Sequence, residues 1–70
     1  MQIVLNGLPR EIGQGTTLAM LVETLAGETE RDPRGIAIEL NREIVPKSEF
    51  SSTVINEGDR LEIVQFVGGG

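Results

Sequence analysis

Apolar residues recur with two different periods along the first 27 residues, and the change predicts a strand hairpin followed by a helix. In QIVLNGLPREI, two short runs with alternating apolar positions flank Asn6-Gly7, a dipeptide typical of a two-residue hairpin turn. Pro9 restricts the second strand to the edge of a sheet, because proline cannot donate a backbone hydrogen bond.

The next segment, GQGTTLAMLVETLAG at residues 13–27, predicts one helix. Its apolar residues have the spacing i, i+3, i+4 and i+7, which places them on one face of a helix. These residues are Leu18, Leu21, Val22 and Leu25. Thr16 or Thr17 is expected to cap the start of the helix, and Gly27 to lie just past its end.

The second half of the chain predicts strands again. After a charged connection at residues 28–35, GIAIEL predicts a third strand with three residues on its core face. These are Ile36, Ile38 and Leu40. A turn at Asn41 leads to a short strand at residues 44–45, which Pro46 ends, and Phe50 is then expected to fill the core.

The last strand is predicted in RLEIVQF, residues 60–66, after a turn in NEGD. The order strand, strand, helix, strand, short strand, strand predicts an α+β fold in which one sheet holds one main helix. The first and last strands are expected to lie parallel at the centre of the sheet. We therefore predict a β-grasp, or ubiquitin-like, domain with a mixed sheet of four to five strands over residues 1–67.

Composition excludes several classes of function. The chain has neither cysteine nor histidine, which removes the usual thiol and imidazole nucleophiles, bases and metal ligands. Its net charge of −5 and its two phenylalanines do not suit a nucleic-acid-binding module. Acidic pairs fall in turns or on exposed strand positions, where no pocket separates the pKa values of two carboxyl groups. We predict a soluble, cytoplasmic protein with neither a bound metal nor catalytic residues of its own.

The last eight residues, IVQFVGGG, end in three glycines, and the residues alone leave two interpretations open: an ordinary frayed end or a reactive terminus. Alternation places Leu61 and Ile63 on the core face of the last strand and directs Val64 and Phe66 outward. Such apolar residues near the end of a strand can anchor a partner protein. The alternative is that strand twist or a bulge returns Phe66 to the core. The glycines at 68–70 form a predicted flexible tail that reaches about 10 Å and has no side chains, so it can pass through a narrow slot.

The chain resembles the ThiS family of ubiquitin-like sulfur carriers over nearly its whole length. The matching segments are MQIVLNG at the start, GTTLAMLVETL in the helix and EGDRLEIVQFVGGG at the end. The block from Asn41 to Phe50 also matches the family pattern Asn-x-x-x-Val-Pro-Lys/Arg-x-x-aromatic. The charged loop at residues 28–35 matches least.

This resemblance implies a protein co-substrate of thiamine biosynthesis. It implies that an E1-like adenylating enzyme of the ThiF type, which uses ATP and magnesium, activates the carboxylate of Gly70. Sulfur, supplied in many systems by a cysteine desulfurase, then gives a thiocarboxylate that a thiazole synthase of the ThiG type consumes. Gly68, Gly69 and Gly70 would enter the partner active sites, and Val64, Phe66 and Val67 are the docking candidates.

Two alternatives remain open from the sequence. The chain could carry sulfur for molybdopterin or another pathway, because the small subunit of molybdopterin synthase shares the fold and the Gly-Gly end. It could also be a non-covalent β-grasp interaction module whose terminal glycines take no part in its function.

Overall fold

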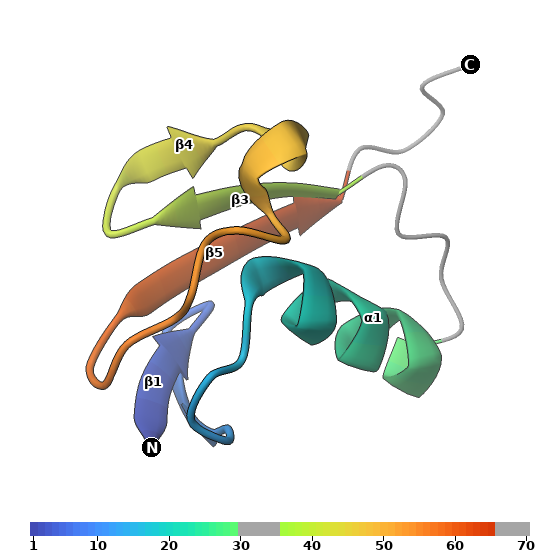
Figure 1. Ribbon diagram of the computed structural model, residues 1–70. Helices are drawn as coiled ribbons and strands as arrows, with labels where there is room; N and C mark the ends of the chain where they lie inside the picture. Colours follow the sequence, from blue (N-terminus) through green and yellow to red (C-terminus); the bar gives the residue numbers. More distant parts are fainter. Residues whose placement is uncertain (30–35, 66–70) are drawn as a thin grey trace.

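The computed structural model describes residues 1–29 and 36–65 of the 70-residue chain (Figure 1). Phe66, Val67 and the glycines at 68–70 lie outside the described residues, as does the predicted boundary between residues 67 and 68. The strands are β1 (Gln2–Leu5), β2 (Leu8–Glu11), β3 (Ile36–Leu40), β4 (Glu43–Val45) and β5 (Arg60–Gln65). The helices are α1 (Leu18–Thr29) and a short 3-10 helix, η2 (Lys47–Glu49).

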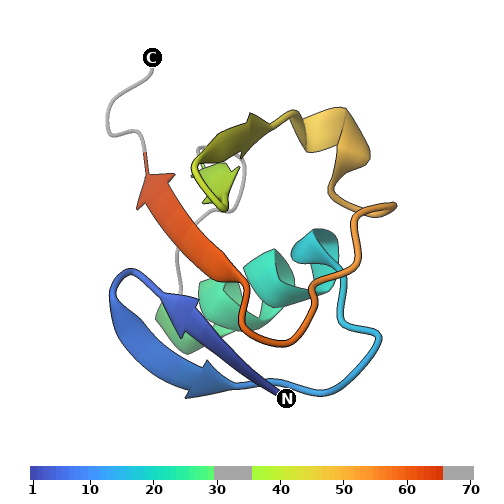
Figure 2. The ribbon, with the colours of Figure 1, turned by 90° about the vertical axis from the view of Figure 1, so that its left-hand side faces the viewer.

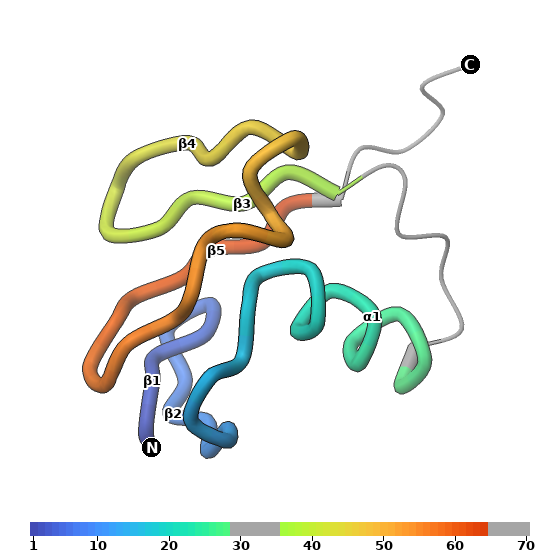
Figure 3. Tube along the Cα trace, viewed as in Figure 1, coloured from blue at the N-terminus to red at the C-terminus, as the bar shows by residue number. Residues whose placement is uncertain are grey.

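The five strands form one mixed sheet in the order β2-β1-β5-β3-β4. β1 pairs antiparallel with β2 and parallel with β5, while β3 pairs antiparallel with both β5 and β4. The predicted parallel pairing of the first and last strands is therefore confirmed, and Pro9 lies on an edge strand as expected. Figures 2 and 3 show α1 covering one side of the curved sheet, which leaves the other side as an open face.

The helix begins as predicted but ends later. Thr17 caps it, because its Oγ1 atom accepts a hydrogen bond of 3.2 Å from the backbone N–H of Met20. The expected end at Gly27 is wrong, since α1 continues to Thr29. Gly27 does not have a left-handed backbone conformation, so the property that makes glycine a helix terminator is not used here.

The segment after β4 returns across the start of α1 and completes the core. The backbone N–H groups of Leu18 and Ala19 donate to the carbonyl oxygens of Thr53 and Phe50, at 3.0 and 3.1 Å. These bonds satisfy donors that the first turn of a helix cannot pair internally. They also hold Phe50 in the core, where its exposed fraction is 8%, which confirms its predicted role.

Among the described residues, nine buried apolar side chains make up the core. They are Ile3, Leu18, Leu21, Val22, Ile36, Ile38, Phe50, Ile55 and Leu61. Seven of these are core positions predicted above, and Ile3 belongs to the alternating apolar positions of the first predicted strand. Ile55 was not predicted and is buried to the same degree as Ile3, with 1% exposure for each. None of the helices among the described residues has both the length and the apolar character needed to cross a membrane.

We expect the substitution Ile55→Ala to lower the free energy of unfolding by about 2–4 kcal/mol, because it leaves a cavity between the returning segment and the helix. Urea denaturation followed by circular dichroism measures this change. Ile44→Ala is the matched control, because Ile44 is 73% exposed and its loss should change stability by less than about 0.5 kcal/mol. Equal losses in the two variants would contradict the assigned packing of Ile55.

Candidate functional site

The end of β5 presents one apolar side chain on the open face of the sheet. Leu61 is buried and Ile63 packs against the core, whereas Val64 is 49% exposed and pairs in register with Ala37 of β3. The predicted alternation along the last strand is thus confirmed for Leu61, Ile63 and Val64. The docking role of Val64 stays a prediction, as do the roles assigned to Phe66, Val67 and the three glycines, which lie outside the described residues.

Asn6 holds the second half of β5 in place. The backbone N–H of Asn6 donates to the carbonyl oxygen of Leu61 at 2.9 Å, and its Oδ1 atom accepts from the N–H of Ile63 at 2.8 Å. β1 ends at Leu5, so this side chain takes the place of the next residue in the parallel ladder. The hairpin turn therefore extends the hydrogen bonding of β5 towards the predicted tail by two residues.

Asn41 makes a corresponding set of bonds at the start of β5. Its N–H donates to the carbonyl oxygen of Arg60 at 2.7 Å, and its Oδ1 atom accepts from the N–H of Arg60 at 2.9 Å. Its amide group also donates to Asp59 at 3.1 Å. Turns from both hairpins thus hold β5, which fixes the position of this strand in the sheet.

Three hollows lined by described residues are smaller than the usual small-molecule site. Their volumes are about 90, 210 and 160 Å³, whereas ligand pockets are typically ~300–1,000 Å³. Among the same residues, the acidic side chains do not gather in groups of three or more that could hold a metal ion. The open face and the end of β5 are therefore the parts of the described structure best suited to act on another molecule.

Sequence reasoning missed two cations on the open face. Arg42 and Arg60 line the same hollow, together with Glu39 and Glu62. Alternation along the last strand could have placed Arg60 and Glu62 beside Val64. The position of Arg42 depends on the pairing of β3 with β5, which the sequence pattern alone does not fix.

A mixed sheet around a central last strand, with one helix across one face, is the β-grasp arrangement of ubiquitin-like proteins. The ThiS family model matches residues 3–70 of this chain. In a search of solved structures, the crystal structure of the thiamine biosynthesis protein ThiS from Geobacter metallireducens matches with a TM-score of 0.82 and 26% identity, and the match covers all of both chains. This chain belongs to the ThiS family.

Two groups of curated relatives differ in length. The sulfur carrier protein ThiS of Escherichia coli is 29% identical over 70 residues, which cover all of both chains. A thiazole synthase of Paramagnetospirillum magneticum is 47% identical over all 70 residues of this chain. The chain spans 20% of the length of that thiazole synthase, and also 20% of a second one from Magnetococcus marinus.

We expect Asn6→Gly to loosen the end of β5 while keeping the turn, because glycine adopts the positive φ of this position but lacks the Oδ1 acceptor. Loss of one hydrogen bond worth about 1 kcal/mol should speed amide hydrogen exchange at Ile63 about five-fold. Nuclear magnetic resonance measures this rate. Asn6→Asp is the control, since it keeps an acceptor oxygen, and an unchanged rate in Asn6→Gly would contradict the role of the side chain.

Proposed function

We propose that this chain is a sulfur carrier of thiamine biosynthesis whose reactive group is the carboxylate of Gly70. An E1-like enzyme adenylates that carboxylate with ATP and magnesium and releases pyrophosphate. A persulfide on a donor such as a cysteine desulfurase then displaces AMP to give an acyl disulfide, and a second thiol reduces its S–S bond, which leaves a thiocarboxylate and a disulfide on the donor side. A thiazole synthase accepts the sulfur, and the carrier returns with its carboxylate.

The observation that carries this proposal is the family match through residue 70, which includes the terminal glycines. The full-length similarity to the E. coli sulfur carrier supports the same role. The relatives named thiazole synthase support a thiazole synthase as the sulfur acceptor, because they contain a segment like this chain within a longer protein.

The described structure suits a co-substrate better than a catalyst. The nine buried core residues are all apolar, and the hollows at the surface are small, so the domain offers little room to enclose a nucleotide. We infer that the partner enzymes supply the catalytic groups, ATP and magnesium, whereas this chain supplies a rigid domain and a reactive end. The predicted cytoplasmic location is part of the same proposal.

Intact mass spectrometry tests the chemistry directly. After incubation with the E1-like enzyme, ATP, magnesium and a sulfur donor, the chain should gain about 16 Da as oxygen is exchanged for sulfur. A variant that lacks Gly70 should keep its mass, because its new end does not reach the reacting atoms. Full support of thiazole formation by this deletion variant would refute the carrier function. Retained partner binding without any mass gain in the wild type would favour a non-covalent interaction module.

We expect Val64→Ser to raise the KM for the carrier in the adenylation reaction about five- to ten-fold with little change in kcat, because a central apolar contact is lost on docking. Phe66→Ala should have the same effect if its side chain also docks. Leu8→Ser is the matched control, since Leu8 is also an exposed apolar residue, at 69%, but lies on the edge strand β2. Equal KM values for Val64→Ser and the wild type would rule out the docking role of Val64.

A further inference from the structure

Two hairpin turns of the sheet share a backbone conformation but differ at one residue. The turn between β1 and β2 has Asn6 with φ 50° and Gly7 with φ 81°, and the turn between β3 and β4 has Asn41 with φ 50° and Arg42 with φ 72°. Two successive left-handed residues favour the sequence Asn-Gly. Arginine at the second position therefore holds a conformation that its side chain disfavours and that glycine adopts freely. Backbone strain of this kind is often kept where a side chain has a function.

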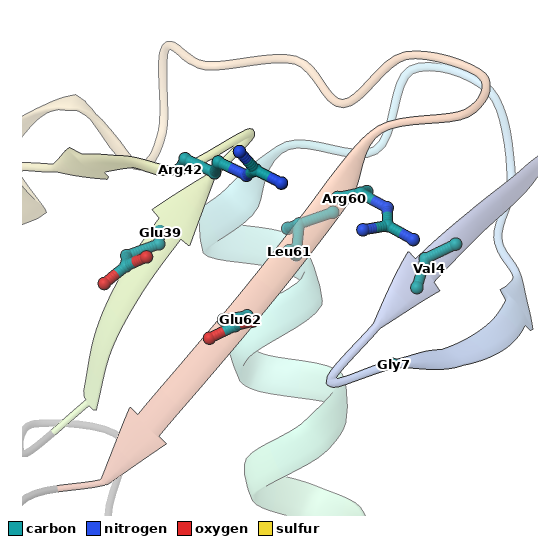
Figure 4. A pocket seen from close by; sticks show the side chains of 7 residues that line it. All are labelled: Val4, Gly7, Glu39, Arg42, Arg60, Leu61 and Glu62. Atoms are coloured by element: carbon teal, nitrogen blue, oxygen red, sulfur yellow. The ribbon is translucent and has the colours of Figure 1, made fainter.

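The Arg42 side chain lies over a hollow of about 90 Å³ in the open face (Figure 4). Arg60 lines the same hollow from the start of β5, and Val4 and Gly7 line its other side. A water molecule occupies about 30 Å³ of liquid, so the hollow has room for a group of the size of a carboxylate. Figure 4 shows both arginine side chains on the side of the sheet away from α1.

These two guanidinium groups have no carboxylate partner within the described part of the chain. The ion pairs found there join the N-terminus to Glu11 and Arg10 to Glu28. Two unpaired cations side by side are unexpected on a chain with a net charge of −5. An ion pair between each guanidinium group and a carboxylate of this chain would stabilise the isolated domain more than two neighbouring unpaired cations do.

Two acidic residues next to the arginines also place like charges beside each other. Glu39 of β3 and Glu62 of β5 lie directly opposite each other in the antiparallel ladder, and like charges at such a pair are unfavourable. Along β5 the open face thus presents a cationic row at Arg60, an anionic row at Glu62 and an apolar row at Val64. A sorted pattern of this kind is costly for the isolated domain and complementary to a partner with the reverse order.

We propose that Arg42 and Arg60 bind a carboxylate side chain on the protein that receives the tail, and that Glu39 and Glu62 contact a basic side chain beside it. Guanidinium groups suit this task because their planar donors match the two oxygens of a carboxylate. The adjacent carboxylates and the net negative charge exclude a nucleic-acid backbone as the natural occupant. The inference rests on the proposed function in one respect, namely that the partner is an enzyme that acts on Gly70.

The spacing of the rows gives the partner a fixed orientation. Arg60 and Val64 are four residues apart on one strand, which corresponds to about 13 Å at ~3.3 Å per residue. The partner is expected to present an acidic group at that distance from the apolar surface that contacts Val64. Contacts at both ends of β5 allow only one orientation of the partner along this strand.

The decisive variant is Arg42→Gly, because it removes the cation and also relieves the strain of the turn. We expect its thermal unfolding midpoint to equal or exceed that of the wild type. The KM for the carrier in adenylation by the E1-like enzyme, or its Kd for the thiazole synthase, should rise about ten-fold while kcat stays unchanged. The difference from the wild type should shrink between about 0.05 M and 0.5 M salt, as charge interactions are screened.

Two further variants make the test specific. Arg60→Gln removes the second cation but keeps the backbone bonds of Arg60 with Asn41, so it should weaken docking to a similar degree. Arg10→Gln is the matched control, because it removes one positive charge from the helix side of the sheet, where Arg10 pairs with Glu28 at 2.6 Å. Its KM and Kd should remain close to those of the wild type.

The outcomes separate this inference from the proposed function. An adenylated wild type with unchanged KM and Kd in Arg42→Gly and Arg60→Gln would overturn the inference alone. A wild type that neither enzyme accepts would overturn the proposed function and the inference with it. A dimer of the wild type that dissociates in Arg42→Gly, detected by sedimentation, would assign the site to a second copy of this chain and also overturn the inference.

Discussion

The pairing of β5 with both β1 and β3 is the constraint on which the described structure depends. The hairpins β1–β2 and β3–β4 lie on opposite sides of this strand, so they are joined in the sheet only through their pairing with β5. Leu61, the second residue of the strand, is almost completely buried in the core. The turns at Asn6 and Asn41 both direct hydrogen bonds to the same strand. A change that displaced β5 would therefore separate the halves of the sheet and move the end of the chain as well.

The sequence predicted the elements well where a single periodicity extends over several residues. Strand alternation located Ile36, Ile38 and Leu61 in the core, and the helical spacing located the stripe on α1. The end of α1 was misplaced because glycine is compatible with a helix interior when packing elsewhere supports the helix. Ile55 was missed because it is a single apolar residue in an irregular segment, and its burial depends on the path by which that segment returns over α1.

The candidate site was predictable only in part for a related reason. Alternation indicates which side chains of β5 leave the core, and the exposure of Val64 agrees with that expectation. The grouping of Arg42 with Arg60, and of Glu39 with Glu62, depends on the register between β3 and β5, which local pattern does not encode. The sequence pattern thus predicts which side chains are exposed, but it does not predict which of the exposed side chains lie next to each other. The pattern of charge on the open face therefore depends on how the strands pair in the sheet.

The parallel pairing of β1 and β5 also has a mechanical consequence. Hydrogen bonds in a sheet run across the strands. A force that pulls β5 along its own axis therefore acts at right angles to the hydrogen bonds that join β5 to β1 and β3, and so shears them. All the bonds of a ladder then share the load at once, instead of breaking one after another as in a hairpin that is opened from its end. The described sheet is therefore expected to resist force along β5 more strongly than force directed across its strands.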